Sequence, residues 1–387
     1  MHQPLKAALV GCGSLSQRGI LPHLSQPDAR ERVVLEAVVD AVEERAAATA
    51  SRFNVPRSFT SVEAMLSSAQ VDLVLVATPI PAHFGNALAA IQAGKHVYVQ
   101  KTMTSTLAEA NQLLAARDRM GVKLAAAPGF VLFPTTGRMR EVVDSGVLGQ
   151  VYIAYTYALG FAHVREPIRS GSGALAEIDP SWYYRAGGGP LPDVGVYSLQ
   201  LITSVLGPVR RVTAFANRGS AERTWKGKTI PVSINDNNLV MLEFASGALG
   251  VAAGSDCRGS ARIPWGGLGL YGTQGTLEIT EVDFASGYPT KFEVQGGAWP
   301  ESQTGADPRE FVCALSESPY LRGEHLQIEE PHVYCDIMDL VEAIQQDRAP
   351  RASGEQARHI VEIVEKAYRA AETGQAQLIE TSFGPPA

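Results

Sequence analysis

The stretch over residues 6–40 constrains the fold of this chain more than any other. An apolar run at residues 7–10 is typical of a strand buried on both faces, and the sequence GCGSLS follows it at once. A second apolar run, at residues 33–39, ends at Asp40. The whole stretch has roughly the 30 residues of a βαβ unit, so it predicts two parallel strands joined by a helix.

The small residues in this stretch suit the binding of a dinucleotide. Gly11 permits a tight turn out of the first strand, and Gly13 lets a pyrophosphate approach the backbone. Ser16 stands where a third glycine is usual and still allows helix and strand to pack closely. The helix start, at Ser14 and Leu15, is expected to offer free N–H groups to the phosphates. The alternative is a glycine turn in an ordinary α/β domain.

The acidic residue that ends the second strand favours NAD over NADP. The carboxylate of Asp40 can accept hydrogen bonds from the two adenosine ribose hydroxyls, and it would repel a 2′-phosphate. No arginine that could bind such a phosphate follows before Arg45. We therefore expect NAD as the cofactor, with NADP the less favoured alternative.

Composition excludes several classes of protein. The chain has 387 residues, which suits two domains, and hydrophobic residues make up 45% of it. Its net charge of −7 argues against a nucleic-acid partner, which would need a basic surface. We expect no signal peptide and no membrane segment, because a strand begins almost at once and no apolar run is long enough to span a bilayer; the scattered cysteines favour a reduced cytoplasmic setting. The cysteines are scattered without a C-x-x-C pair, which predicts neither a zinc site nor disulfides: Cys12, Cys257, Cys313 and Cys335.

Two domains are predicted from the order of the patterns. Strand and helix patterns alternate in a first domain over residues 1–128, which predicts an α/β fold with a doubly wound parallel sheet. Residues 129–387 read as an α+β domain with a mostly antiparallel sheet, including a plausible hairpin over residues 239–253. No element is assigned over residues 281–331, which are rich in Gly, Pro, Ser and Glu. Two further helices are predicted at residues 333–346 and 355–372.

Several landmarks, in this order, resemble the Gfo/Idh/MocA family of oxidoreductases. They are LVGCGSLS, a buried strand ending in Thr78-Pro79, AGKHV leading to Lys101, GGGPLPDVGVY at residues 187–197, and the C-terminal HIVEIVEKAYRAAETGQ. The resemblance implies an N-terminal Rossmann domain and a C-terminal domain whose large open sheet commonly forms the interface of a homo-oligomer. It also implies NAD(P)-linked oxidation or reduction of a hydroxyl on a sugar, sugar derivative or cyclic polyol.

The resemblance assigns three residues to catalysis. Lys101 matches the lysine of the family's E-K-P motif, and Asp193 and Tyr197 match its D-x-G-x-H/Y motif. Tyr197 would exchange the hydroxyl proton, but its ordinary pKa is about 10, so Lys101 is expected to lower that pKa and to stabilise the oxyanion. Asp193 would orient Tyr197 or bind a substrate hydroxyl. The alternatives are a surface lysine, a packed tyrosine and a helix-capping aspartate.

This chain also departs from the family at the cofactor site. Gln100 and Thr102 replace the family's Glu and Pro, and Ile80 replaces an Asn. A cis bond before Thr102 would cost about 2.5–4 kcal/mol, so we expect the local backbone to differ. His83 matches a family histidine, with a capping or packing role as the alternative. The cofactor-binding candidates are Gly11, Gly13, Ser14, Leu15, Asp40, Thr78, Pro79, His83, Gln100 and Lys101.

Further residues are candidates for the substrate pocket. Trp182 and Arg185 suit stacking on a sugar and holding its hydroxyls, although a core or interface aromatic cluster is an equally good interpretation. His163 could line the same pocket, beside Lys101, Asp193 and Tyr197. A metal site at helical spacing is the less favoured interpretation of His332, Asp336 and Asp339, since a solvated or capping helix face explains them better. No metal is predicted.

The hypothesis is an NAD-dependent oxidoreductase that acts on a secondary hydroxyl of a carbohydrate or cyclic polyol. A first alternative is a glycosidase or lyase that oxidises, eliminates, adds water and re-reduces, which regenerates its NAD. A second alternative is a non-catalytic NAD-binding regulator, which would have no use for Lys101 and Tyr197 together.

Overall fold

A computed structural model describes residues 3–159, 163–166, 169, 177–256, 265–283, 288–300 and 305–384. Cys257 lies outside these residues, while Cys12, Cys313 and Cys335 are buried free thiols. None of the described helices is long and apolar enough to cross a membrane.

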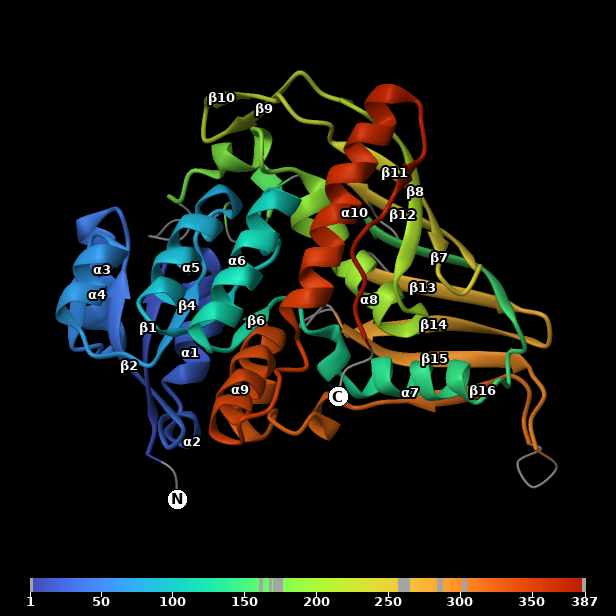
Figure 1. Ribbon diagram of the computed structural model, residues 1–387, viewed down its shortest axis with the longest axis horizontal. Helices are drawn as coiled ribbons and strands as arrows, with labels where there is room; N and C mark the ends of the chain where they lie inside the picture. The colour runs from blue at the N-terminus through green and yellow to red at the C-terminus, as the bar shows by residue number, and fades with distance from the viewer. Residues whose placement is uncertain are drawn as a thin grey trace.

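The first sheet confirms the predicted doubly wound fold. Its six strands are parallel and lie in the order β3-β2-β1-β4-β5-β6, so the chain reverses direction across the sheet between β1 and β4 (Figure 1). The strands form because short apolar runs are buried on both faces, as in β4, where all four residues are buried. The strands are β1 (Leu5–Val10), β2 (Val33–Val39), β3 (Arg57–Phe59), β4 (Leu73–Val76), β5 (His96–Val99) and β6 (Leu124–Ala126).

Helices connect these strands. A helical run over residues 14–24 follows the glycine turn and contains one π-turn at Ser16–Ile20. Thr106 begins α6 with the predicted capping box, in which its side chain accepts from Glu109 N and the Glu109 side chain returns to the Thr106 backbone. The α-helices are α1 (Leu21–Leu24), α2 (Pro27–Arg30), α3 (Glu43–Phe53), α4 (Val62–Ser68), α5 (His83–Gln92) and α6 (Leu107–Met120).

The second sheet has nine strands and is mostly antiparallel, as predicted. Its order is β16-β15-β14-β13-β7-β12-β11-β8-β17, and β7 with β12 is the parallel pair. The predicted hairpin is the antiparallel pair β11–β12. The strands are β7 (Val151–Leu159), β8 (Val209–Asn217), β11 (Asn237–Phe244), β12 (Leu249–Ser255), β13 (Trp265–Gly272), β14 (Gly275–Asp283), β15 (Tyr288–Gly296), β16 (Arg309–Val312) and β17 (Gln377–Leu378). A separate hairpin pairs β9 (Glu222–Trp225) with β10 (Lys228–Pro231).

Helices cover one face of this second sheet. They are α7 (Pro134–Asp144), α8 (Val196–Leu206) and α10 (Gly354–Thr373); α10 lies between the two sheets in Figure 1, and α7 lies along β15. Ile360 and Ile363 of α10 enter the core under the second sheet, while Ala357 and Val361 enter a core of the first. The last long helix, α9 (Pro331–Gln345), packs against the first sheet. The C-terminal helices therefore tie the two sheets together, and the domain boundary at residue 128 stays a prediction.

Residues 281–331 contain two strands that the sequence did not reveal. They are β15, which pairs antiparallel with β14, and β16, which pairs antiparallel with β15 and ends the second sheet. Gly and Pro flank these strands, which hides the alternating pattern that a strand normally shows.

The predicted solvated or capping face of α9 is wrong. His332, Asp336 and Asp339 are all buried, with 1%, 0% and 0% exposure, because α9 packs directly against the first sheet. Among the residues that the structure describes, no group of three or more His, Cys, Asp or Glu side chains could hold a metal ion.

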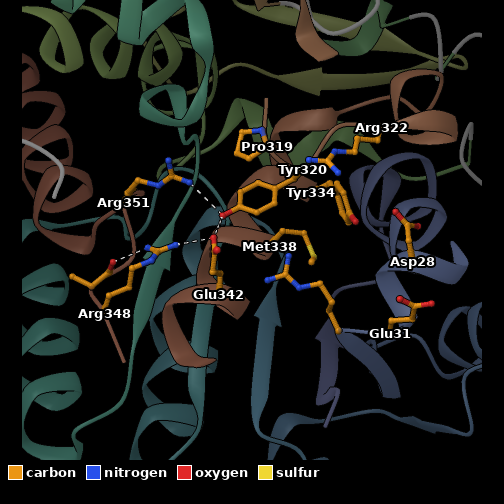
Figure 2. A pocket seen from close by; sticks show the side chains of 12 residues that line it. Asp28, Glu31, Pro319, Tyr320, Arg322, Tyr334, Met338, Glu342, Arg348 and Arg351 are labelled. Carbon is orange, nitrogen blue, oxygen red and sulfur yellow. Dashed lines mark hydrogen bonds and ion pairs between the residues drawn. The ribbon is translucent and has the colours of Figure 1, made fainter. Parts of the chain in front are cut away.

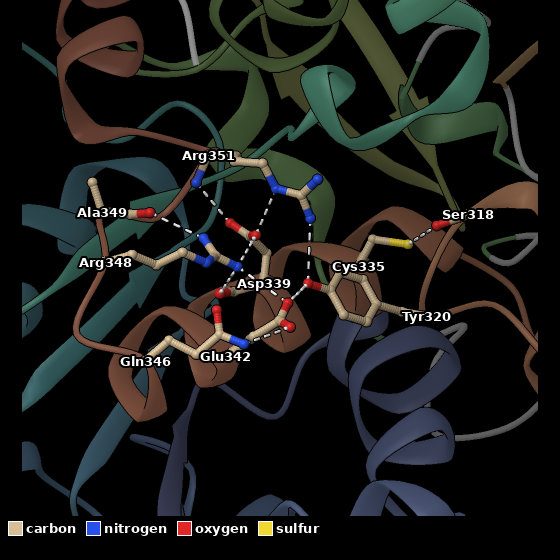
Figure 3. A network of polar contacts seen from close by, with 9 residues as sticks. All are labelled: Ser318, Tyr320, Cys335, Asp339, Glu342, Gln346, Arg348, Ala349 and Arg351. Carbon is tan, nitrogen blue, oxygen red and sulfur yellow. Dashed lines mark hydrogen bonds and ion pairs between the residues drawn. The ribbon is translucent and has the colours of Figure 1, made fainter. Parts of the chain in front are cut away.

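Asp339 joins α9 to the segment that follows it (Figure 3). Its Oδ1 accepts from Arg348 Nη2 at 2.8 Å and from Arg351 Nε at 2.9 Å, and its Oδ2 accepts from the Arg351 backbone N at 2.7 Å. Arg351 Nη2 also donates to Tyr320 Oη at 3.3 Å. A fully buried carboxylate is stable here because it is paired and hydrogen-bonded on both oxygens.

Asp339→Ala should therefore lower the free energy of unfolding by about 2–3 kcal/mol, because two arginines and a backbone N–H lose their acceptor. The loss stays below that of a fully buried pair, since the arginine side chains are 30% and 31% exposed. Urea unfolding followed by circular dichroism measures it. The control is Glu380→Ala, whose carboxylate is 76% exposed beside Lys366 and should change stability by less than about 0.5 kcal/mol. Equal losses in both variants would contradict the role of Asp339.

Candidate active site

The glycine turn lies at the carboxyl edge of the first sheet, between β1 and β4. Gly11 has a φ of +99°, and a Cβ there would lie 2.5 Å from the Ala77 carbonyl oxygen, so only glycine fits. Ser16 Oγ donates to Gly11 O at 2.5 Å, which shows why a small residue stands there. A Cβ on Gly13 would meet no atom within 4 Å, so open space lies above this residue. The turn is therefore rigid on its protein side and open on the other.

Asp40 lies beside this turn, as the sequence predicts. Its Oδ2 accepts from Cys12 N at 2.9 Å, and its Oδ1 accepts from Val42 N at 2.9 Å. Arg45 Nη1 approaches Oδ1 at 3.3 Å. The carboxylate thus holds the glycine turn and also accepts from Arg45 Nη1 on both oxygens.

His83 connects two loops from inside the protein. Its Nε2 lies 2.7 Å from Thr78 O and its Nδ1 lies 2.8 Å from Thr102 O. The ring is fully buried, and burial lowers its pKa. Both ring nitrogens face protein carbonyls, so His83 positions the loops after β4 and β5 and offers no free nitrogen to a ligand. This matches the packing alternative for His83.

Lys101 follows β5 at the same edge and forms the central ion pair of the site. Its Nζ lies 2.6 Å from Asp193 Oδ1 and 2.7 Å from Asp193 O, and the two side chains are 14% and 11% exposed. Thr102 Oγ1 donates to Pro192 O beside it. The Lys101–Thr102 peptide bond is cis, contrary to the expectation that its cost would change the backbone here. The structure thus brings together the predicted lysine and aspartate from segments 92 residues apart.

Gln100, which stands where the family has a glutamate, is buried and hydrogen-bonded within the protein. Its Nε2 donates to Tyr98 Oη at 2.6 Å, and Tyr98 Oη donates to Asp336 Oδ2 at 3.2 Å. Gln100 is 3% exposed, so it is tied to the sheet beneath the lysine.

Tyr197 lies four residues after Asp193, in the first turn of α8. Its ring centroid is 5.3 Å from Lys101 Nζ, and its hydroxyl oxygen is 3.4 Å from His332 Nε2. Burial raises the pKa of Tyr197 well above its ordinary value, and Glu330 and Asp193 raise it further. The expected lowering of this pKa by Lys101 is therefore wrong, because desolvation and two nearby carboxylates disfavour the phenolate.

His332 belongs to this site although the sequence did not predict it there. It is buried at the start of α9, 135 residues from Tyr197 along the chain. Its Nδ1 lies 3.3 Å from Glu330 Oε2, and Glu330 forms an ion pair with Arg18. No local pattern predicts this neighbour, because only the packing of α9 against the first sheet brings it to Tyr197.

Two of the predicted substrate residues, His163 and Trp182, lie in an aromatic cluster with Tyr183. His163 stacks on Tyr183 with ring centroids 4.3 Å apart, and its two ring nitrogens lie 3.0 Å from Glu166 and 2.6 Å from Arg169. Trp182 packs against the same cluster, and Arg185 is exposed. His163 is thus engaged by its own segment, which favours the aromatic-cluster interpretation for it.

Two cavities adjoin the first domain, one beside the lysine loop and one at the opposite edge of the first sheet. One, of about 500 Å³, adjoins the lysine loop and is lined by Ile80, Thr102, Ser105, Gly188, Pro192 and Tyr368, among others. The other, of about 730 Å³, lies beside Arg32, which directly precedes β2 and so marks the opposite, amino edge of the first sheet (Figure 2). Two of its arginines, Arg348 and Arg351, are already paired with Asp339. The glycine turn and the Lys101–Asp193 pair therefore mark the candidate active site, and the larger cavity does not.

Known families account for this arrangement. The family described as "Oxidoreductase family, NAD-binding Rossmann fold" matches residues 5–127, and the "GFO/IDH/MocA C-terminal domain" matches residues 136–278. The chain belongs to the Gfo/Idh/MocA family. It is therefore an oxidoreductase with an NAD-binding Rossmann fold, and the open Gly13, the glycine turn and Asp40 fit that cofactor.

Several curated relatives are dehydrogenases. The trans-1,2-dihydrobenzene-1,2-diol dehydrogenase of Mus musculus is 26% identical over 325 residues, which cover 82% of this chain and 87% of that protein. The D-glucoside 3-dehydrogenase of Escherichia coli is 28% identical over 253 residues, which cover 64% and 68%. Among solved structures, a levoglucosan dehydrogenase in complex with NADH and levoglucosan has the same fold, with a TM-score of 0.79, 18% identity, and coverage of 98% and 100%.

Gly13→Ala should weaken NAD binding at least about tenfold, because the added methyl group would occupy the open space through which the pyrophosphate approaches. Thermal stability should barely change, since the Cβ meets no protein atom within 4 Å. Isothermal titration calorimetry with NAD and NADH measures the affinity. Gly85→Ala, on α5, is the matched control because its Cβ also meets nothing within 4 Å. Equal affinities in both variants would place the pyrophosphate elsewhere.

Proposed function

We propose that this protein is an NAD-dependent dehydrogenase or reductase that acts on a secondary hydroxyl of a sugar, sugar derivative or cyclic polyol. The observation that carries the proposal is the Lys101–Asp193 pair at the carboxyl edge of the first sheet, the edge that also holds the glycine turn. Ligands of open α/β sheets bind at this edge, where the strand order reverses. Relatives of this chain are named as dehydrogenases of a glucoside, levoglucosan and a cyclic diol, which supports this substrate class.

Lys101 has the central role in the proposed mechanism. Its ammonium group, held by two contacts to Asp193, stabilises the negative charge that develops on the substrate oxygen. Asp193 fixes the position of the ammonium group, and its second carboxylate oxygen can accept from a substrate hydroxyl. NAD, when bound, supplies the hydride acceptor.

Tyr197 exchanges the proton of the substrate hydroxyl in this proposal. Because its pKa is raised, the residue is a phenol at neutral pH. A phenol can accept the substrate proton only if it gives its own proton to a neighbour in the same step. The mechanism therefore requires a base on the far side of Tyr197.

Asp40 favours NAD over NADP in this proposal. Its carboxylate points at the glycine turn, and Arg45, the nearest arginine along the chain, already pairs with it. A 2′-phosphate would meet the carboxylate first.

One assay tests the function and separates its alternatives. Purified protein is incubated with NAD and a panel containing levoglucosan, methyl β-D-glucoside, myo-inositol and trans-1,2-cyclohexanediol, with nicotinamide absorbance and product mass followed together. NADH that accompanies a product two hydrogens lighter supports the proposal. A cleaved glycoside without net NADH favours the redox-cycling glycosidase, and NAD binding without any product favours the regulator.

Lys101→Ala should lower kcat/KM on the active substrate by about 1000-fold, because the oxyanion loses its charged neighbour. The affinity for NAD should change little if the lysine acts on the substrate oxygen. Steady-state kinetics measures the first effect and calorimetry the second. Lys95→Ala, at the amino end of β5, is the control and should keep wild-type turnover. Near-wild-type turnover in Lys101→Ala would exclude this mechanism.

We also propose that the open face of the second sheet joins copies of this chain into a homo-oligomer. Large apolar side chains on this face are exposed by 42–80%: Phe215, Leu239, Met241, Leu249 and Val251. The strand register places Leu239 opposite Phe215 and Met241 opposite Val251, so they form one patch. Contiguous apolar patches of this kind mark interaction surfaces.

The double substitution Leu239→Glu, Met241→Glu should therefore convert the oligomer to monomers, because like charges would face each other across the interface. Size-exclusion chromatography with light scattering measures the mass. Met120→Glu is the control, since Met120 is 45% exposed at the end of α6 on the other domain. A wild-type protein that is already monomeric would contradict this assignment.

A further inference from the structure

We propose that His332 is the proton partner of Tyr197, so that the substrate proton passes through the phenol to a buried imidazole that Glu330 orients. This inference deepens the proposed function and rests on it. His332 acts through Tyr197 and is therefore a positioning residue rather than a catalytic one.

The geometry supplies the contact. Tyr197 Oη lies 3.4 Å from His332 Nε2, and the two rings meet edge to face with centroids 5.8 Å apart. Catalytic hydrogen bonds are often long before substrate binds and tighten in the complex. Lys101 Nζ lies 5.3 Å from the Tyr197 ring centroid. In the proposed function this ammonium group stabilises the charge on the substrate oxygen.

Glu330 favours one tautomer of His332. Its Oε2 lies 3.3 Å from His332 Nδ1, which makes no hydrogen bond to the described residues, and the negative charge favours a proton on this nitrogen. In the proposal a neutral His332 therefore carries its proton on Nδ1 and presents the lone pair of Nε2 to the Tyr197 hydroxyl. A carboxylate that holds a histidine in one tautomer has this same role in hydrolytic triads.

The surroundings keep Glu330 ionised and His332 neutral. Burial acts to raise the pKa of Glu330, but the charged groups of Arg18 and Lys101 act to lower it, and that pKa is lowered. Burial lowers the pKa of His332 to about 4, so its lone pair is available at neutral pH. The groups that face His332 are Glu330, Lys101, Arg18, His23, Tyr197 and Tyr288.

The backbone holds Glu330 in place. Glu330 has a φ of +58° and Pro331 follows it as the first residue of α9. A Cβ on Gly19 would lie 2.8 Å from Glu330 Cβ, so the helical run after the glycine turn touches this residue directly. Arg18, from the same run, forms the ion pair with Glu330. The proton partner is thus built against the helix that begins at the nucleotide turn.

The step balances in protons and electrons. NAD, held at the glycine turn, would accept the hydride of the substrate C–H bond and be reduced, and the alcohol carbon would become a carbonyl carbon. The substrate O–H proton moves to Tyr197 Oη while the phenolic proton moves to His332 Nε2. The imidazolium beside the Glu330 carboxylate returns this proton through Tyr197 to water after the ketone leaves.

A spectroscopic test needs no substrate. The ring nitrogens of histidine, labelled with ¹⁵N, are observed in the NAD-bound protein, and His332→Gln assigns the signals. The proposal expects Nδ1 protonated and Nε2 free as a hydrogen-bond acceptor, with the Nε2 shift moving toward that of an unbonded nitrogen in Tyr197→Phe. A proton on Nε2, or an unchanged signal in Tyr197→Phe, would overturn the proposal.

A kinetic test uses the substrate that the panel identifies. His332→Gln keeps a polar side chain without a basic nitrogen, and its kcat should fall about 100-fold while KM changes less than about threefold. His359→Gln is the matched control, because His359 is also buried with a pKa lowered to about 4 by burial, but it bonds Val209 N and Thr381. A kcat that stays within threefold of wild type in His332→Gln would overturn the proposal. Absence of any turnover in the wild type would instead contradict the proposed function, and the spectroscopic test would still decide the proton partner.

Discussion

The ion pair between Lys101 and Asp193 is the interaction on which the candidate active site depends. Lys101 belongs to the loop after β5 of the first sheet, and Asp193 belongs to the turn that leads into α8 under the second sheet. Neither half of the molecule contains both charges. Because both side chains are largely buried, either charge would destabilise the fold if it were unpaired. The pair therefore holds the two halves together and also positions the ammonium group of the candidate site.

Helices from the end of the chain give this pair a rigid frame. One face of α10 enters the core of the first sheet and another enters the core of the second. The start of α9 brings His332 to Tyr197, and Glu330 connects it to Arg18 beside the glycine turn. The cofactor turn, the ion pair and the tyrosine are therefore held by one continuous set of packed elements, which suits a reaction that requires accurate placement of two reactants.

The electrostatics of Tyr197 changes the mechanism expected from a lysine neighbour alone. A lysine 5.3 Å from the ring centroid does not offset desolvation and the nearby carboxylates Glu330 and Asp193, so the phenol keeps its proton. The reaction then needs a neighbour that takes this proton, and His332 is placed to do so. The same carboxylate that disfavours the phenolate acts against the burial that lowers the pKa of His332, because Glu330 lies beside the Nδ1 of that ring.

Local sequence was sufficient for the elements whose signals are short-range. The strand at residues 7–10, the glycine turn and Asp40 form one contiguous βαβ unit, so their spacing alone predicted the nucleotide edge. Lys101, Asp193 and Tyr197 could be named because each lies in a recognisable motif. Tertiary structure decided what these groups do: the burial that raises the pKa of Tyr197, the engagement of His163 by its own segment, and the arrival of His332 from the far end of the chain. Those properties depend on desolvation and on contacts between residues more than 100 positions apart or across a loop, and neither has a signature in local periodicity.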